Sequence, residues 1–302
     1  MISPDVIDRI RVRPGKKVRL KDYHTGWKQT DELAEAGKAA VKERAKEVLE
    51  RSLADLADAQ DLLYADDRYA VLVVLQAMDA AGKDGTIKHV MSGVNPQGCQ
   101  VFSFKKPSAE DLDHTFLWRY VRCLPERGRI GIFNRSYYED VLVVKVHPEL
   151  LGRQLPRTPK SVGKGFWEER YEDILALERH LVRNGTVVLK FFLHVSKEEQ
   201  KRRFLARLDR PEKNWKFSAA DLAERGHWDE YMAAFEDALA ATSTDAAPWY
   251  VVPADDKWAS RAVVADVLTT TIRGLDLRHP ELTDDDRKRL ADARTRLGRE
   301  DD

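Results

Sequence analysis

Residues 70–87 read AVLVVLQAMDAAGKDGTI, and this stretch decides the fold. Its first six residues form a short, continuous, largely β-branched apolar run, which is typical of a strand buried on both faces of a parallel sheet. A loop of small residues follows, then Gly82-Lys83 and a helical pattern through Met91. The backbone N–H groups of such a loop and of the helix start can cradle phosphate. The stretch therefore predicts a phosphate-binding loop in an α/β fold.

The loop departs from the common phosphate-loop pattern at two positions. Ala77 stands where the pattern has Gly, and Asp84 stands directly after the lysine, where Ser or Thr is usual. A Gly-Lys pair alone is equally a surface turn, so its place after the strand carries the prediction. We expect Lys83 to contact the transferred phosphate, and its neighbours to bind phosphate or nucleotide: Ala80, Ala81, Gly82, Asp84, Gly85 and Thr86. Thr86 could instead cap the helix.

Asp79 adds a second feature to this loop. A carboxylate beside a phosphate group repels it unless a cation lies between them, so the natural role of Asp79 is to hold Mg²⁺ against phosphoryl oxygens. The alternative is that Asp79 caps the following turn. We expect a magnesium ion here, with Mn²⁺ as the other ion that the site could take.

Similar apolar runs and helical patterns alternate through the rest of the chain. The runs are Val101 to Phe104, Gly131 to Phe133, Val187 to Val195 and Trp249 to Val252. The helical patterns between them are Asp111 to Cys123, Phe166 to Val182, Lys197 to Leu208 and His227 to Ala241. Strands that alternate with helices predict a doubly wound parallel sheet with flanking helices.

The length of 302 residues allows one large α/β domain, which we favour over two small ones. Residues 31–65 carry apolar residues at helical spacing, which predicts a long amphipathic helix or helix pair in an N-terminal arm over 1–69. We place the phosphate-loop domain at 70–275, with a helical lid over about 197–225, and a helical tail at 276–302. The Arg, Pro, Lys and Gly residues of 152–165 indicate a mobile surface connection.

Bulk composition excludes several classes of protein. Apolar residues make up 43% of the chain and charged residues 34%, as in soluble globular proteins, and no apolar run reaches the length of a membrane span. The basic start has no apolar signal segment behind it, so we expect a cytoplasmic protein. Cys99 and Cys123 are too few for a disulfide framework or zinc site and are interpreted as small core residues. Basic and acidic residues balance at 51 each, which argues neither for nor against a polyanionic partner.

Residues 130–140, IGIFNRSYYED, form the second functional element. The apolar run delivers polar residues to the C-terminal end of a strand, where open α/β sheets bind ligands. An acidic residue there usually organises the metal. Asn134 stands in that position and adds no charge, so more of this role falls to Asp79, with Glu139 or Asp140 as helpers. Arg135 has fixed donors suited to a phosphoryl group, although it could instead pair with a nearby acid.

Residues 201–216, KRRFLARLDRPEKNWK, form the third element. Arg203 and Arg207 lie four apart and share a helix face. Basic charge followed by Pro and a new helix favours a closing lid that adds cations to the transferring phosphoryl, although alone it would be a solvated basic face. Four further basic residues carry a weaker prediction. They could line a path for a polyanion, or their long side chains could merely extend along apolar surface to place the charge in water. They are Lys105, Lys106, Arg119 and Arg122.

These motifs resemble the polyphosphate kinase 2 family. The resemblance runs from about residue 30 to about 270 and is carried by four motifs in order: DAAGKDGT at 79–86, SGVNPQG at 92–98, FNRSYY at 133–138, and RLD with PEKNWK within 207–216. It implies a thymidylate-kinase-like P-loop fold with a helical lid. It also implies transfer of a terminal phosphoryl group between inorganic polyphosphate and a nucleotide, with Mg²⁺.

Carried over by position, Asp79 resembles the family's metal-site aspartate, Lys83 its phosphate lysine and Arg135 the arginine after the second strand, with Arg203 and Arg207 as lid arginines. Most members have Asp where this chain has Asn134. The NRSYYED version is similar to the subgroup that accepts both AMP and ADP, with Glu139 a candidate for that breadth. The resemblance implies adenine nucleotides as partners, with other purine nucleotides as a further option, and a dimer or tetramer. We expect no nucleic acid and no membrane.

Two rival functions stay open from the residues alone. An ATP-dependent nucleotide kinase needs the same loop, so only the family motifs favour polyphosphate as donor. A non-catalytic polyanion- or nucleotide-binding protein is the second rival, because the loop is irregular and Asn134 replaces an acid. Incubation with AMP, Mg²⁺ and either polyphosphate or ATP would separate the three.

Overall fold

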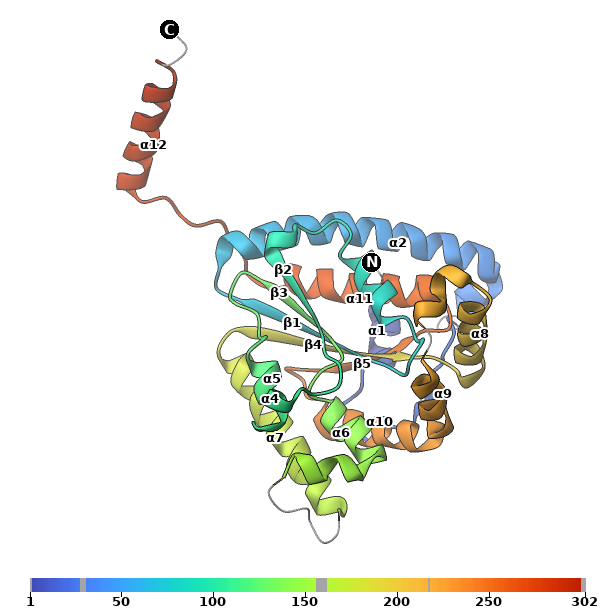
Figure 1. The fold of residues 1–302 in the computed structure, drawn as a ribbon. Helices are drawn as coiled ribbons and strands as arrows, with labels where there is room; N and C mark the ends of the chain where they lie inside the picture. The colour runs from blue at the N-terminus through green and yellow to red at the C-terminus, as the bar shows by residue number, and fades with distance from the viewer. Residues whose placement is uncertain (1, 28–30, 156–161, 217, 300–302) are drawn as a thin grey trace.

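The computed structural model describes residues 2–27, 31–155, 162–216 and 218–299 (Figure 1). Parts of four predicted segments lie outside the described residues. They are residues 1 and 28–30 of the N-terminal arm, 156–161 of the 152–165 connection, 217 of the lid and 300–302 of the C-terminal tail.

A parallel sheet forms the centre of the molecule (Figure 1). Its strands lie in the order β2 (Cys99–Ser103), β3 (Ile130–Asn134), β1 (Ala70–Gln76), β4 (Thr186–His194) and β5 (Trp249–Pro253). Every neighbouring pair is parallel. The predicted parallel α/β fold is confirmed. Predicted and observed strand ends differ by two residues or fewer, most at β2, which lies at an edge of the sheet and, among the described strands, pairs with β3 alone.

Helices cover both faces of the sheet. The helices are α1 (Pro4–Ile10), α2 (Asp31–Asp66), α3 (Lys83–Val90), α4 (Ala109–Leu112), α5 (Trp118–Val121), α6 (Glu139–Val146), α7 (Lys164–Arg183), α8 (Lys197–Leu208), α9 (Ala219–Gly226), α10 (Trp228–Thr242), α11 (Lys257–Arg273) and α12 (Asp284–Leu297). Short 3₁₀ turns are η1 (Leu20–Asp22), η2 (Pro96–Gly98), η3 (Pro148–Arg153) and η4 (Pro211–Lys216). Helices α2, α3 and α11 pack together, and α6, α7 and α10 form the opposite layer.

One helix prediction was wrong. The pattern over 111–123 predicts a single helix, but the structure has two short helices, α4 and α5, with a turn between them. Ser108 and Asp111 form a capping box, so the first helix begins two residues before the predicted start. The next residues are Asp113, His114 and Thr115, and all three residue types have low helix propensity. The apolar residues of this region therefore pack around the turn and do not form one face of a single helix.

The N-terminal part of the chain packs against the far edge of the sheet. Arg11 forms an antiparallel bridge with Tyr250 of β5, and Val6 and Ile10 of α1 are buried. The predicted long helix is confirmed as α2, with non-helical backbone angles at Gly37. Helix α12 projects away from the body of the molecule (Figure 1). Within the described ranges, no helix is both long enough and apolar enough to cross a membrane.

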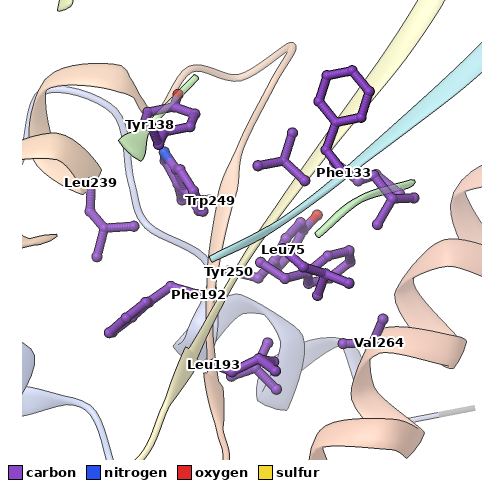
Figure 2. Close-up of a cluster of buried hydrophobic side chains, with 14 of the residues drawn as sticks. Leu75, Phe133, Tyr138, Phe192, Leu193, Leu239, Trp249, Tyr250 and Val264 are labelled. Carbon is purple, nitrogen blue, oxygen red and sulfur yellow. The ribbon is translucent and has the colours of Figure 1, made fainter. Parts of the chain in front are cut away.

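The core fixes the sheet edge that carries the polar residues. Figure 2 shows Leu75, Phe133, Phe192 and Leu193 among the buried side chains between the layers. Leu75 and Phe133 are at most 1% exposed and immediately precede Gln76 and Asn134. Interiors are close-packed, so such anchored residues hold the polar side chains that follow them in one place.

Candidate functional site

The loop between β1 and α3 has the backbone conformation of an anion nest. Ala80 has φ +62° and Gly82 has φ +113°, both in the left-handed region, and α3 begins at Lys83 with Gly82 as its N-cap. Left-handed residues within a turn point successive N–H groups into one concavity, and the helix start adds further donors. A left-handed alanine costs conformational energy, so other contacts must hold this loop.

Arg203 supplies that support from below the loop. Its Nη1 donates to the carbonyl oxygens of Ala80 at 2.9 Å and Ala81 at 2.6 Å. Its Nη2 donates to the carbonyl of Ala254 at 2.6 Å, and its Nε pairs with Glu199 at 2.7 Å. The side chain is 6% exposed. Arg203 therefore braces the phosphate loop, because its guanidinium donors are directed to protein oxygens.

Lys83 is buried at the start of α3. Its ammonium donates to the carbonyl of Ala77 at 2.9 Å, across the base of the loop. Burial lowers the pKa of Lys83, the charge of Arg135 lowers it further, and the Asp79 carboxylate opposes the change. The lysine charge is thus desolvated and poorly compensated, which makes an anion on the loop a favourable partner.

Arg135 follows β3 in a left-handed conformation, with φ +66°. Its backbone N–H donates to Leu75 at 3.0 Å, and its Nη2 contacts Asp79 Oδ1 at 2.8 Å. Glu139 lies 3.9 Å from its Nη1. Burial alone would lower the pKa of Arg135, but Glu139 and Asp79 outweigh it, so the pKa is raised. The alternative considered from sequence, an ion pair with a nearby acid, is the arrangement observed.

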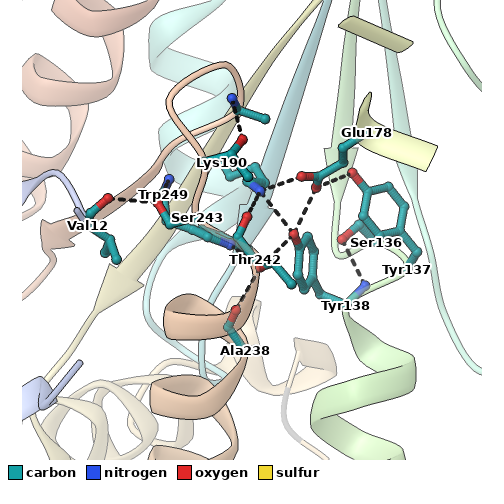
Figure 3. A network of polar contacts seen from close by, with 12 residues as sticks. Val12, Ser136, Tyr137, Tyr138, Glu178, Lys190, Ala238, Thr242, Ser243 and Trp249 are labelled. Atoms are coloured by element: carbon teal, nitrogen blue, oxygen red, sulfur yellow. Dashed lines mark hydrogen bonds and ion pairs between the residues drawn. The ribbon is translucent and has the colours of Figure 1, made fainter. Parts of the chain in front are cut away.

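Two buried tyrosines hold the segment after Arg135 (Figure 3). The hydroxyls of Tyr137 and Tyr138 both donate to Glu178 Oε1, at 2.9 Å and 2.8 Å. Lys190 pairs with Glu178 Oε2 at 2.5 Å, and both charged side chains are at most 2% exposed. The Tyr138 hydroxyl oxygen also lies 2.9 Å from Thr242 Oγ1. This network joins the turn after β3 to α7, β4 and α10.

Asn134 faces the loop from the end of β3. Its amide nitrogen donates to Asp84 Oδ1 at 2.8 Å and to Ser103 Oγ at 3.3 Å. The amide oxygen is thus the atom left to coordinate a cation. No cluster of three or more His, Cys, Asp or Glu side chains that could hold a metal occurs in the described part of the chain. A cation here would need phosphate or water oxygens beside the protein ligands, as Mg²⁺ usually has.

The two acids of the NRSYYED motif point to different places. Glu139 accepts from Gln76 Nε2 at 2.9 Å and lies near Arg135, so it faces the site. Asp140 is buried and accepts from Tyr120 at 3.2 Å and Gln154 at 2.8 Å. Burial raises the pKa of Asp140 to about 6, although the Gln154 bond opposes this. Asp140 is therefore a structural carboxyl, away from the phosphate loop.

The region predicted as a lid brings further residues to the site. Asp221 of α9 is half-buried, and burial and the nearby Asp79 charge raise its pKa, while Arg207, Arg135 and Lys83 oppose the rise. Arg207 lies 4.0 Å from Asp221 and is 26% exposed. Sequence reasoning missed Asp221; an acid within a basic lid was the available signal.

Gln200 was also missed. Its side-chain amide donates to the backbone carbonyl of Asp79 at 3.0 Å and accepts from Arg225 at 2.7 Å. Both residues come from the lid region, on α8 and α9. The lid helices are thus tied to the phosphate loop through Gln200.

The four basic residues considered for a polyanion path lie in the segment that follows β2. Lys105 and Lys106 are exposed just after this strand. Arg119 donates to the carbonyl of Lys105 at 2.7 Å and lies 3.4 Å from Asp111. Arg122 stacks over Trp118. A polyanion path over these residues stays a prediction; their local contacts show that both arginines also have structural partners.

Among the predicted binding residues, the structure brings Asp79, Lys83, Asp84, Asn134, Arg135 and Glu139 together at one edge of the sheet. Gly85 and buried Thr86 lie in the first turns of α3, and Thr86 does not cap the helix, because Gly82 is its N-cap. A parallel sheet in the order β2-β3-β1-β4-β5, with an anion nest after β1 and an arginine after β3, defines a P-loop protein of the kinase type. The chain belongs to the polyphosphate kinase 2 family, whose model matches residues 39–280.

Relatives extend over nearly the whole chain. An ADP-polyphosphate phosphotransferase of Rhodopseudomonas palustris is 54% identical over 289 residues, covering 96% of this chain and 97% of its own. An AMP/ADP-polyphosphate phosphotransferase of Meiothermus ruber is 45% identical, covering 90% and 95%. The crystal structure of a polyphosphate kinase 2 from Arthrobacter aurescens has a TM-score of 0.80 at 37% identity, covering 93% and 95%.

Proposed function

We propose that this protein transfers a terminal phosphoryl group between inorganic polyphosphate and AMP or ADP. Membership of the polyphosphate kinase 2 family and the names of its relatives support this reaction class. The structural observation that carries the proposal is the cluster of Asp79, Lys83 and Arg135 around the anion nest. In this cluster, Lys83 and Arg135 provide partly desolvated positive charge, and Asp79 provides a carboxylate that can hold a cation. Such a set suits a phosphoryl group whose charge is neutralised from several sides.

The protein acts in this reaction mainly by alignment and charge neutralisation. The loop N–H groups and Lys83 hold the terminal phosphoryl group, and Arg135 leaves Asp79 to contact its oxygens. The acceptor's terminal phosphate oxygen is already ionised near neutral pH, so no strong general base is needed. The lid residues on α8 and α9, including Arg207, exclude water by closing over the acceptor.

A divalent cation fits the donor set, and we propose Mg²⁺, with Mn²⁺ as a substitute. Asp79 would hold it, with the amide oxygen of Asn134 as a second ligand and Asp221 as a third candidate on α9. When bound, the ion neutralises charge on the phosphoryl oxygens. Because Asn134 carries no charge, Asp79 provides most of the protein's attraction for the ion.

The acceptor range is proposed to include both AMP and ADP. The relative from Meiothermus ruber is named for both nucleotides, and that from Rhodopseudomonas palustris for ADP. Glu139 is the candidate determinant, since it lies beside Arg135 and is held by Gln76. Replacement with Gln should change the ratio of AMP to ADP turnover more than the overall rate.

The first experiment compares donors. The protein is incubated with AMP and Mg²⁺ and with either polyphosphate or ATP, and the nucleotides are separated by chromatography. ADP and ATP formed with polyphosphate alone support the proposal, whereas product formed only with ATP favours a nucleotide kinase. No product with either donor, from protein with a normal melting curve, favours a binding protein.

The second experiment tests the loop. Lys83→Ala should lose most of the turnover while it keeps the fold, because Lys83 supplies charge to the phosphoryl group rather than packing to the core. Lys88→Ala, an exposed change on the same helix, is the matched control. Near wild-type turnover of Lys83→Ala would overturn the role assigned to the loop.

Location and assembly complete the proposal. We propose a cytoplasmic homo-oligomer, a dimer or tetramer, with the N-terminal helices as a contact. We also keep the division into an arm at 1–69, a phosphotransferase domain at 70–275 and a tail at 276–302. Cell fractionation and analytical ultracentrifugation test the first two points, and expression of 70–275 alone tests the third.

A further inference from the structure

A basic pocket lies within the N-terminal segment, away from the phosphate loop. The cavity has a volume of about 270 Å³. Its charged lining consists of Arg9, Arg11, Arg13, Lys16, Lys17 and Asp8. Five basic side chains thus face one carboxylate. The whole chain has no net charge, so this concentration is a local feature and not a consequence of a basic protein.

The pocket is built on a turn that the sequence specifies. In Arg13-Pro14-Gly15-Lys16, the N–H of Lys16 donates to the carbonyl of Arg13 at 3.4 Å, and Gly15 has φ +68°. Proline is common at the second position of a type II turn, and the positive φ at the third position favours glycine. Val12 and Val18, at most 4% exposed, anchor the two sides of this turn in the core. The cations are therefore presented by fixed backbone.

Three of these five cations have no acidic partner among the described residues. Arg13, Lys16 and Lys17 are exposed and form no ion pair with any residue that the structure describes. Arg11 donates to a backbone carbonyl, that of Asp245, at 3.2 Å. By contrast, nearby Arg19 pairs with Asp22 at 2.8 Å. Unpaired cations around a shared cavity attract a multivalent anion, which releases counterions when it binds.

We propose that this pocket is a second binding site for inorganic polyphosphate, an inference that rests on the proposed function. A chain of phosphoryl groups offers one negative charge per unit, which matches closely spaced cations. The volume lies just below the range usual for drug-sized ligands, so a short stretch of chain fits. The lining has one aromatic residue, half-buried Tyr23, so it lacks the successive rings on which nucleic-acid bases stack.

The position of the pocket indicates what the site does. Arg11 and Val12 contact Tyr250 and Trp249 at the start of β5, whereas the phosphate loop follows the end of β1. The segment then returns to the active edge, where Asp255 donates to the carbonyl of Thr25 at 2.9 Å. A long polyphosphate held at the pocket stays at high local concentration near the loop. A chain too short to span both sites gains nothing.

The test compares two triple variants with equal charge change. R13Q/K16Q/K17Q removes the pocket's cations, and K42Q/R44Q/K46Q removes three exposed cations of α2 as the control. The measurement is KM for polyphosphate of about 100 units and for tripolyphosphate. The pocket variant should raise KM about tenfold for the long chain only, with kcat and the nucleotide KM unchanged. Equal KM values for the two variants would overturn the proposal.

Direct binding separates this inference from the proposed function. Calorimetry of each variant with long polyphosphate, over a series of salt concentrations, should show weaker binding and a smaller salt dependence for the pocket variant alone. If the wild type turns over no polyphosphate, the proposed function fails, and the calorimetry still decides on the pocket. Identical isotherms for the pocket variant and the control refute the second site whatever the activity.

Discussion

The guanidinium of Arg135 contacts the carboxylate of Asp79 at 2.8 Å, across the gap between the ends of β3 and β1. Each residue was expected from sequence to meet a ligand, one a phosphoryl group and the other a metal ion. In the structure they contact each other. We expect a bound phosphoryl group and cation to take the place of this ion pair, with Arg135 on the anion and Asp79 on the cation.

Asp79→Asn should abolish most activity at little cost in stability. The variant keeps a hydrogen-bonding side chain beside Arg135 but loses the charge that attracts a cation. We expect turnover to fall at least about 100-fold and the magnesium concentration for half-maximal rate to rise. The pair is 39% and 26% exposed, so unfolding free energy should change by less than about 1 kcal/mol. Unchanged magnesium dependence would rule out a metal role for Asp79.

Arg203→Lys should weaken the phosphate loop. One ammonium cannot replace the guanidinium that donates to Ala80, Ala81 and Ala254 together. We expect a loss of about 2–3 kcal/mol of unfolding free energy, measured by urea denaturation, and a lower kcat. Arg202→Lys is the control, since Arg202 shares the partner Glu199 but is 69% exposed. Equal stability of both variants would show that Arg203 does not brace the loop.

The sheet and the centre of the site could be predicted because they depend on local sequence. The run before Gln76 is uniformly apolar, and polar residues follow it at once. Since carboxyl ends of parallel strands meet at one edge, Asp79 and Arg135 were expected there together, and they are in contact. The region 111–123 shows the limit of this reasoning, because apolar spacing alone does not reveal a turn between two short helices.

The positions of the remaining site residues depend on how segments that are distant in the sequence pack against the phosphate loop. Arg203 and Arg207 share a helix face by spacing, yet one is 6% exposed beneath the loop and the other 26% exposed near Asp221. Periodicity gives the face but not which turn of the helix meets the loop. Gln200 and Asp221 reach the site only because α8 and α9 pack beside it. An acid within the basic lid was a signal for Asp221, but no local pattern shows how close either helix comes to the loop.

Lys190→Met should destabilise the protein strongly. The change leaves Glu178 as a fully buried carboxylate without its 2.5 Å partner (Figure 3). Loss of one member of a buried ion pair costs about 3–5 kcal/mol. Urea denaturation should show this loss, whereas the control Lys145→Met breaks a pair whose acid, Asp237, is 62% exposed and should cost about 1 kcal/mol or less.

The double variant distinguishes charge from packing at this site. E178Q/K190M removes both charges and should recover part of the stability lost in Lys190→Met, since no unpaired charge stays buried. Tyr137 and Tyr138 would still have an amide oxygen to donate to. A double variant less stable than Lys190→Met would mean that the network acts through its hydrogen bonds and not through charge neutralisation.

Asp140→Asn should stabilise the protein at neutral pH but not in acid. The folded-state pKa is raised from 3.8 to about 6 by burial, so the folded protein holds this proton more tightly than the unfolded chain. That contribution to stability is fully present below the unfolded pKa and is lost as the pH rises through about 6. Asparagine stays neutral, can accept from Gln154 and can donate to the Tyr120 oxygen. Chemical denaturation at about pH 4 and about pH 7.5 should show an advantage for the variant that grows to about 2–3 kcal/mol at the higher pH. Asp58→Asn is an exposed change on α2 and serves as the control. A pH-independent difference for Asp140→Asn would mean that the folded and unfolded chains bind this proton equally well, so that burial does not raise the pKa of Asp140.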